Sequence, residues 1–561
     1  MKAGYLILAL AALLASCCTK PEGGGGSAET EGKQDVSFLA DPVFILPEEP
    51  LTRDTIPDFS RVGYHWGEDV FPDYANVVRV PAPTGGDDTG LIQDAIDSAP
   101  ERSVILLQEG TYRVDSIIML DRSGLVLRGS GDKATTIRAA GKTLRHVVVM
   151  GRVMRDAAGA RIIKTTSKSI AGVGTTVHYL VKVRTPQLSA REQTGPMIPL
   201  VGDAFCGADF VEVSDPSSFN VGDRVSLYRP ATSGWLDAIH MREIVQAATD
   251  EDVITQWTPA AYGMWWDRTV VGVEGRRIWL DNPVVMSMTS GFGGGMLVKT
   301  SWDRISESGV ENLVFESEFD SSVVEDGMYI DEEHASTAVL VGAAEHCRVK
   351  DITVRYFSTS AVDLSSGAQN ITVEDCRSLS PVSRINGGWR YAFHISGGGC
   401  CLVRNCLCDE DRHGFVLGTK VPGPNAFVDC TGERMYSILG PHQRWSTGCL
   451  YDNCVTSGGL VVKDAGNSGT GQGWQGANMV FWNCRASSIV CQSPWASALN
   501  WSVGCTPRAT ASASYAAGDN LGRRPLGVVR DRLPGEPERL YDTQLQERLA
   551  AGSRISNASA L

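Results

Sequence analysis

The sequence predicts an all-β fold in which short parallel strands coil into a solenoid. Three features lead to this prediction: a high glycine content, an Asp-Cys or Asn-Cys pair that recurs in the C-terminal half, and a short β-rich segment before each pair. Glycine supplies 60 of the 561 residues, well above its usual share of roughly 7 %, and this indicates many turns. The 43 % hydrophobic content excludes a disordered or collagen-like chain.

The recurring pair sets the length of one coil. Its copies are 24 or 30 residues apart, which suits several short strands and Gly/Asn-rich corners stacked about 4.8 Å apart. A helical repeat would need apolar residues that recur about every 3.6 residues, and these segments lack that pattern. Leu313 and Ile352 take the cysteine position in two earlier copies. The later copies are Asp375-Cys376, Asn405-Cys406, Asp429-Cys430, Asn453-Cys454 and Asn483-Cys484.

We expect the cysteines of these pairs to fill the interior as small, reduced hydrophobic residues, while the Asn and Asp side chains form hydrogen bonds at the corners. Disulfides between stacked coils are the alternative in an exported protein. Cys400, Cys401, Cys406 and Cys408 lie close together in the sequence, but no histidines accompany them at the spacing of a zinc site. No zinc site is therefore predicted, and no metal ligands are assigned.

The N-terminal part points to the same fold. Gly85–Thr89 leads into Ile92–Ala99, which predicts a short capped helix, and strand-like segments follow from Val104 to Leu127. This passage resembles the pectin-lyase-like superfamily, in which such a helix often caps the first coil. The resemblance covers about residues 75–140 and 300–505. It implies a right-handed, single-stranded parallel β-helix that acts on a polysaccharide.

The first residues are typical of an export signal. Lys2 is followed by the apolar run Tyr5–Ala15, which is too short to cross a bilayer core that needs about 20 residues. Leu14-Ala15-Ser16-Cys17 resembles the bacterial lipoprotein signal, which implies lipidation of Cys17; simple cleavage is the alternative. We expect an exported protein, anchored to a bacterial membrane by its lipid alone and facing the periplasm or the cell surface.

Composition and the presence or absence of the repeat divide the chain into six segments. They are a lipoprotein signal peptide (1–16), a flexible tether (17–58), a cap with the first coils (59–140), a β-rich insertion (141–300), the main β-helix (301–505) and a C-terminal tail (506–561) with a helix near Pro537–Ala551. Lys and Arg number 51 against 65 Asp and Glu, a net charge of −14, so a broad phosphate-binding surface and a nucleic-acid partner are not expected. The oligomeric state is not indicated.

The repeat also predicts which side chains share a face. Residues ten and twelve positions before the cysteines alternate with less polar neighbours, so they should point outward; the cysteines counted are Cys406, Cys430, Cys454 and Cys484. In this register His394, Gly418 and His442 share one row, provided that the extra residues of the longer coils lie elsewhere. Equivalent side chains of adjacent coils would be about 5 Å apart. The predicted outer strip comprises His394, Lys420, His442, Arg444, Gln472 and Trp474.

Neighbouring segments add further polar side chains. Gly440–Trp445 combines a turn with His, Arg and Trp, and these segments resemble exported bacterial β-helix proteins described as pectate-lyase-like. Many of those relatives have histidine at the position of Gln472, so the glutamine argues against proton transfer there. The added residues are Arg390, Asp411, Arg412, His413 and Trp445, together with Glu333 and His334.

The strip suits β-elimination on a uronic-acid-containing polysaccharide, in which a base removes the proton alpha to a carboxylate while cations neutralise the enolate. His442 is the expected base, and a calcium ion held by Asp or Glu can share the neutralisation; no other cofactor is expected. The expected catalytic residues are His442, Arg444, His413, Arg412, Asp411 and His394, and the expected substrate-binding residues are Lys420, Trp474, Gln472, Trp445, Arg390, Glu333 and His334.

Two alternatives stay open. A glycoside hydrolase needs two carboxyl groups about 5 to 9.5 Å apart, and Asp409, Asp411, Glu433, Glu332 and Glu333 are candidates. A glycan-binding protein without turnover would use the same strip and its tryptophans. The histidines and cations of the strip favour elimination, with an anionic polysaccharide as the partner.

Overall fold

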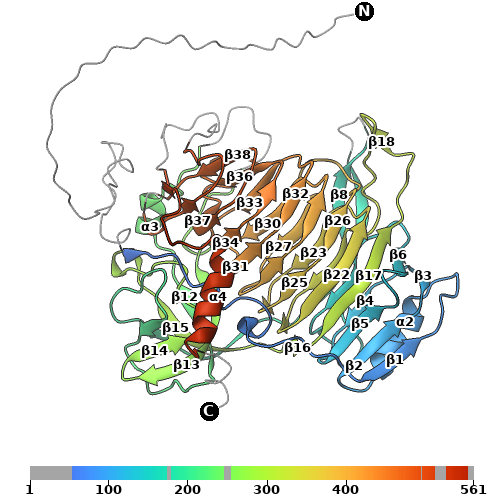
Figure 1. The fold of residues 1–561 in the computed structure, drawn as a ribbon, viewed down its shortest axis with the longest axis horizontal. Coiled ribbons are helices and arrows are strands. Elements are labelled where there is room, and N and C mark those ends of the chain that lie inside the picture. The colour runs from blue at the N-terminus through green and yellow to red at the C-terminus, as the bar shows by residue number, and fades with distance from the viewer. Residues whose placement is uncertain (1–52, 174–177, 246–253, 495, 512–525, 554–561) are drawn as a thin grey trace, which may run out of the picture. The chain divides into compact units, whose positions relative to one another are not determined.

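The computed structural model describes residues 53–173, 178–245, 254–494, 496–511 and 526–553. It confirms a right-handed parallel β-helix, because short parallel strands stack coil upon coil in two large sheets and one small one (Figure 1). The predicted signal peptide and Cys17 lie outside the described residues. Within those residues, no helix has the length and apolar character needed to span a membrane.

The first sheet carries the cysteine repeat. Leu313 pairs with Ile352. In the later coils, the strand before each Asn/Asp-Cys corner pairs with the corresponding strand of the next coil. The strands are β1 (Asn76–Val80), β2 (Ser103–Leu107), β3 (Gly110–Val114), β5 (Leu125–Gly129), β6 (Thr135–Ala139), β17 (Gly309–Ser317), β22 (Arg348–Arg355), β25 (Thr372–Glu374), β26 (Arg377–Leu379), β28 (Leu402–Arg404), β29 (Leu407–Asp409), β31 (Asn425–Val428), β32 (Thr431–Glu433), β34 (Ser446–Asp452), β35 (Val455–Thr456), β37 (Gly476–Trp482), β39 (Trp501–Val503) and β40 (Val528–Arg530).

The second sheet runs along another side of each coil and bears the candidate site. Its strands are β4 (Ile118–Leu120), β7 (Leu144–Met150), β20 (Thr337–Val341), β23 (Ser360–Leu364), β27 (Tyr391–Ile395), β30 (His413–Thr419), β33 (Ile438–Gln443), β36 (Gly459–Val462) and β38 (Ser488–Cys491), extended by the hairpin of β8 (Ile163–Ala171) and β9 (His178–Pro186). A small third sheet contains β16 (Ile305–Ser306), β21 (Ala344–Glu345) and β24 (Ala368–Gln369), and β18 (Val324–Glu325) pairs with β19 (Met328–Tyr329).

The Asn and Asp residues of the repeat form the corners. Asp375, Asn405, Asp429, Asn453 and Asn483 all have φ between 51° and 58°, a left-handed conformation that these two residue types tolerate better than most. The amide of Asn405 donates to Asp375 Oδ1 at 2.5 Å, and that of Asn453 to Asp429 Oδ1 at 2.6 Å. The corner role predicted from the repeat is confirmed.

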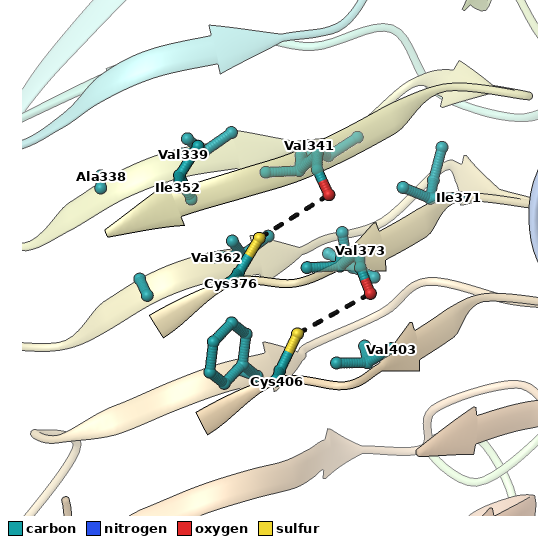
Figure 2. Close-up of a cluster of buried hydrophobic side chains, with 14 of the residues drawn as sticks. Ala338, Val339, Val341, Ile352, Val362, Ile371, Val373, Cys376, Val403 and Cys406 are labelled. Carbon is teal, nitrogen blue, oxygen red and sulfur yellow. Dashed lines mark hydrogen bonds between the residues drawn. The ribbon is translucent and has the colours of Figure 1, made fainter. Parts of the chain in front are cut away.

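The cysteines of the repeat point into the core in reduced form. All described cysteines are free, and all except Cys505 are buried. Each repeat thiol donates a hydrogen bond to a carbonyl of the preceding coil, as Cys406 does to Val373 O at 3.8 Å (Figure 2) and Cys454 does to Phe427 O at 3.4 Å. The prediction of small, buried, unoxidised side chains is confirmed.

The expected tether is shorter than predicted, since its last residues pack on the coils. Asp54 is buried, and Ile56 packs against a core that includes residues of β31 and β34. The residues after the predicted tether contain the short helix η2 (Tyr64–Gly67), and α4 (Leu540–Ala550) contacts them through Arg548, whose guanidinium donates to Ser60 O at 3.1 Å. The expected C-terminal and capping helices are present as α4 and α2 (Thr89–Ser98).

The insertion begins later than the predicted residue 141, because β7 pairs in parallel with β4 and β20 and so belongs to the coils. It folds as a six-stranded antiparallel sheet that includes α3 (Ser233–Ala238) and η3 (Ser290–Phe292) in its connections. Its strands are β10 (Glu192–Pro199), β11 (Phe210–Glu212), β12 (Arg224–Arg229), β13 (Met264–Glu274), β14 (Arg277–Leu280) and β15 (Met296–Ser301).

Candidate functional site

A cluster of one tyrosine and three histidines lies on the second sheet, contributed by β27, β30 and β33. The hydroxyl of Tyr391 is 3.1 Å from His442 Nε2. The rings of His413 and His442 are 4.7 Å apart between centroids, and those of Tyr391 and His394 are 5.3 Å apart. We call Tyr391, His394, His413 and His442 the ring cluster.

The strand register explains the cluster and corrects one row of the prediction. Leu417 pairs with Pro441, which puts Gly418 beside His442 as expected. Ile395 pairs with Leu417, so Ser396, and not His394, is the neighbour of Gly418. His394 still reaches the cluster, because Gly418 has no Cβ: one built there would lie 3.2 Å from His394 Nε2.

Burial keeps the histidines of the cluster neutral. Burial and then the charge of Arg412 lower the pKa of His442 to about 4, so its imidazole is uncharged at neutral pH. Burial and the neighbouring His442 lower the pKa of His413 to about 3, and its Nδ1–H donates to Ile438 O at 2.8 Å. Burial raises the pKa of Tyr391, against the charge of Arg412, so the hydroxyl is protonated.

Asp363 is part of the site and was not predicted. It lies opposite His394 in the register, 3.7 Å from His394 Nδ1, and accepts a hydrogen bond from Ser396 Oγ at 2.6 Å. Counting from Cys376 misses Asp363, because its coil differs by one residue from the next. Tyr391 was also missed as a site residue, although it directly follows Arg390, which was predicted to bind substrate.

The cations predicted for the site flank the cluster. Arg412 lies beside Tyr391 and donates to Gly387 O. Arg444 donates to Thr470 Oγ1 at 2.6 Å. The backbone N–H of Lys420 donates to Arg444 O, and that of Arg444 donates to Gln472 O, each at 3.0 Å. Lys420 and Arg444 therefore follow one another on successive coils, as the repeat predicts, whereas Gln472, which was predicted in the row of His442, bonds to Arg444 instead.

The two predicted tryptophans are buried, and the expectation that they bind substrate is wrong. Trp445 and Trp474 have no exposed surface. The indole of Trp474 donates to Ile239 O at 3.0 Å, and Trp445 packs edge-on against Trp235 of α3 with centroids 5.0 Å apart. The insertion covers both side chains, so they attach the insertion to the coils.

Three more predicted site residues are structural. Arg390 is buried and donates to Ser383 O at 2.7 Å, and His334 is buried between Ser317 Oγ at 2.8 Å and Val382 O at 3.0 Å. Asp411 has no exposed surface, and burial raises its pKa to about 8. None of the three can reach a substrate in this structure. Glu333 is half-buried, and its charge adds to the burial that raises the pKa of Tyr179 on β9.

Within the described ranges, no group of three His, Cys, Asp or Glu side chains is arranged to hold a metal ion. The site is thus a row of neutral imidazoles and a phenol, with guanidinium groups beside it. Such groups can accept a proton, donate a proton and stabilise an anion.

Comparison with known proteins gives no match among protein families or curated proteins. Among solved structures, the chain is similar to the tailspike protein gp49 from Pseudomonas phage LKA1, with 15 % identity over 75 % of this chain and 56 % of that chain and a TM-score of 0.42. It thus spans little more than half of that tailspike.

For two other solved structures, the match covers a larger share of the other chain. The polygalacturonase from Erwinia carotovora ssp. carotovora shows 9 % identity over 80 % of this chain and 96 % of that chain, with a TM-score of 0.34. PfbA, a surface adhesin of Streptococcus pneumoniae, shows 11 % identity over 77 % and 84 %, also with a TM-score of 0.34. The strand register itself defines this chain as a parallel β-helix protein.

Proposed function

We propose that this chain is an exported enzyme that cleaves a uronic-acid-containing polysaccharide by β-elimination. The observation that carries the proposal is the contact of the Tyr391 hydroxyl with a neutral imidazole, 3.1 Å from His442 Nε2, with Arg412 and Arg444 beside it. The resemblance of residues 75–140 and 300–505 to the pectin-lyase-like superfamily supports a polysaccharide as the substrate.

His442 acts as the base in this mechanism. Its neutral imidazole removes the proton alpha to the uronate carboxylate, and the electron pair of that C–H bond forms the C4–C5 double bond. Negative charge develops on the carboxylate during this step. Arg412 and Arg444 stabilise it, because permanent cations placed beforehand need no reorganisation.

Tyr391 acts as the acid. As the C4–O bond breaks, its hydroxyl gives a proton to the leaving glycosidic oxygen, and Arg412 stabilises the resulting phenolate. His442 then carries the proton taken from the sugar and lies within hydrogen-bond distance of the phenolate. Transfer of that proton from His442 to Tyr391 restores both groups. An acid and a base on the same side of the sugar ring suit syn elimination.

Hydrolysis is less well supported, because three of the five candidate carboxyl groups are paired with arginine or inaccessible. Asp409 pairs with Arg434, and Glu332 is buried and pairs with Arg384 at 3.5 Å. Asp411 is inaccessible. The carboxylate of Asp363 is in the site, but it accepts a hydrogen bond from Ser396 and lies beside the imidazole of His394.

The test is the chemistry of the product. The chain is incubated with polygalacturonate, alginate, hyaluronate and neutral polysaccharides, and the unsaturated uronate is followed by its ultraviolet absorbance. Tyr391→Phe and His442→Gln should each lower kcat by about 100-fold or more, as removal of a general acid or base does. Tyr541→Phe on α4 and His65→Gln on η2 are matched controls and should keep activity.

Three results would contradict the proposal. Saturated reducing ends would indicate hydrolysis, and binding without any product would indicate a glycan-binding protein. Full activity of Tyr391→Phe would show that Tyr391 and His442 do not act as the acid–base pair. Parallel assays with a chelator and with added calcium tell whether calcium shares the neutralisation with the arginines.

A further inference from the structure

A cleft of about 360 Å³ lies between the insertion and the coils. The insertion side contributes Trp265 of β13 and Trp302, and Arg191 lies just before β10. The coil side contributes Ser396 and the segment Thr419–Lys420. Its volume falls within the range of about 300 to 1,000 Å³ that is usual for ligand sites.

The cleft adjoins the ring cluster. Ser396 lines the cleft and also donates to Asp363, which pairs with His394 of the cluster. Thr419 directly follows Gly418, the residue over which the His394 imidazole lies. A polymer bound at the ring cluster can therefore extend into the cleft without leaving the surface of the second sheet.

The charge of the cleft is positive. Its lining includes the cations Arg191, Arg268, Arg304 and Lys420, and the carboxylate of Asp267. Asp267 lies 3.1 Å from Arg191 and 2.8 Å from Arg304. Burial alone would raise the pKa of Asp267, but these two arginines hold it below its usual value. Arg304 also lies 3.6 Å from Glu345. The four cations of the lining still outnumber these two carboxylates, and the excess of positive charge suits an anion.

Two of the cations are placed to meet a ligand. Lys420 is half-buried, and its Nζ donates to Ala261 O at 2.5 Å, a neutral partner that leaves the charge uncompensated. Arg191 keeps 27 % of its side chain exposed and lies over the Trp265 ring at 4.5 Å. Arg268, in contrast, is buried and donates to backbone carbonyls, so it contributes only to the positive electrostatic potential of the cleft.

We propose that this cleft is a second subsite, built by the insertion, that binds an anionic sugar unit of the polymer next to the unit that reacts. Arg191 and Lys420 bind its carboxylate, and the hydroxyls of Ser396 and Thr419 face its sugar ring. The proposal rests on the proposed function for the position of the reacting unit. It implies that the insertion selects polymers with charged units on both sides of the cleaved bond.

The test measures binding apart from turnover. In the His442→Gln background, affinity for polygalacturonate, alginate, hyaluronate and carboxyl-reduced polygalacturonate is measured by affinity electrophoresis and calorimetry. We expect at least one uronate polymer to bind, the carboxyl-reduced polymer not to bind, and salt to weaken binding. Arg191→Gln and Lys420→Gln should each raise Kd about tenfold, the effect of losing one hydrogen bond to a charged group.

The controls separate charge from folding. Arg191→Lys and Lys420→Arg keep the charge and should recover part of the affinity. Arg138→Gln, on β6 of the first sheet, removes a cation that pairs with Glu316 and should leave Kd unchanged. Thermal unfolding of each variant shows whether the fold is kept.

The outcomes distinguish this subsite from the proposed function. If no uronate polymer binds, or if Arg191→Gln and Lys420→Gln leave Kd unchanged, the subsite is overturned. If these variants weaken binding while the unmodified chain cleaves nothing, the subsite stands and the elimination mechanism falls. If the unmodified chain is a lyase whose KM is the same in both variants, the mechanism stands and the subsite falls.

Discussion

At the scale of single residues, burial sets the chemistry of the site. His442 loses hydration inside the ring cluster, and Arg412 adds a positive charge nearby, so that both effects disfavour the imidazolium form. The same burial keeps the Tyr391 hydroxyl protonated. A base that is neutral and an acid that is protonated can thus coexist over a wide range of pH.

This arrangement predicts the pH dependence of the elimination. Because the base must be neutral, kcat/KM should fall on the acid side, with a midpoint near the His442 pKa of about 4. Arg412→Gln removes a charge that lowers this pKa, so the acid limb should move to higher pH while the rate also falls. An acid limb that stays in place in Arg412→Gln would contradict the assignment of His442 as the base.

Asp411 carries a second prediction at this scale. Its folded-state pKa of about 8 lies above the usual 3.8, so the unfolded chain ionises first as the pH rises. Stability is therefore lost between about pH 4 and 8, at up to about 1.4 kcal/mol per pH unit. Asp411→Asn should remove this loss and be more stable than the unmodified chain at pH 8, as urea unfolding would measure. Asp409→Asn, which loses an ion pair instead, should show no such gain.

At the scale of elements, the corners and the insertion position the site. Each left-handed Asn or Asp lets the chain turn within one residue, so strands of successive coils stay in register. The insertion then covers the coils through Trp445 and Trp474 and forms one wall of the cleft.

The corners predict a simple ranking of variants. Asn453→Ala loses both an easily adopted left-handed conformation and the hydrogen bond to Asp429, and should cost about 2 kcal/mol of unfolding free energy. Asn453→Gly loses only the hydrogen bond and should cost less. Asn386→Ala, in an exposed loop, is the control and should be close to neutral. If Asn453→Ala and Asn453→Gly lose the same unfolding free energy, the left-handed conformation at this position has no energetic cost for alanine and this explanation of the corners is wrong.

At the scale of the whole molecule, the number of buried neutral histidines is notable. Burial lowers the pKa of each member of this set, so the folded state disfavours the protonated form of each imidazole. The set comprises His146, His334, His346, His394, His413 and His442.

The set predicts strong destabilisation by acid. The folded-state pKa values lie below the unfolded value of about 6.5, so the unfolded chain takes up protons first as the pH falls. The contribution of these histidines to stability should be complete above about pH 6.5 and fall progressively from there toward the folded values near 3 and 4. Urea midpoints measured from pH 7 to pH 4 would test this. His413→Gln should make the fall less steep, whereas His65→Gln should not, since Glu307 raises the pKa of His65.

The sequence by itself determined the features that repeat: the coil length, the Asn and Asp residues at the corners, and the thiols of the interior. Each depends on the same residue type returning at the same point of a coil, so position along the chain is enough to predict it. His394 and His442 of the ring cluster were found by counting along the repeat, together with Lys420 and Arg444, whereas His413 and Arg412 were found in a neighbouring polar segment.

Only the tertiary structure decided which outward side chains meet and which are covered. Coils of unequal length shift the register, which moved His394 by two residues and hid Asp363. The insertion folds back on the coils from far away in the sequence, which buried Trp445 and Trp474 and created the cleft at Lys420. The physical reason is that the exposure of a side chain depends on the segment packed over it, and a repeat carries no information about a segment outside it.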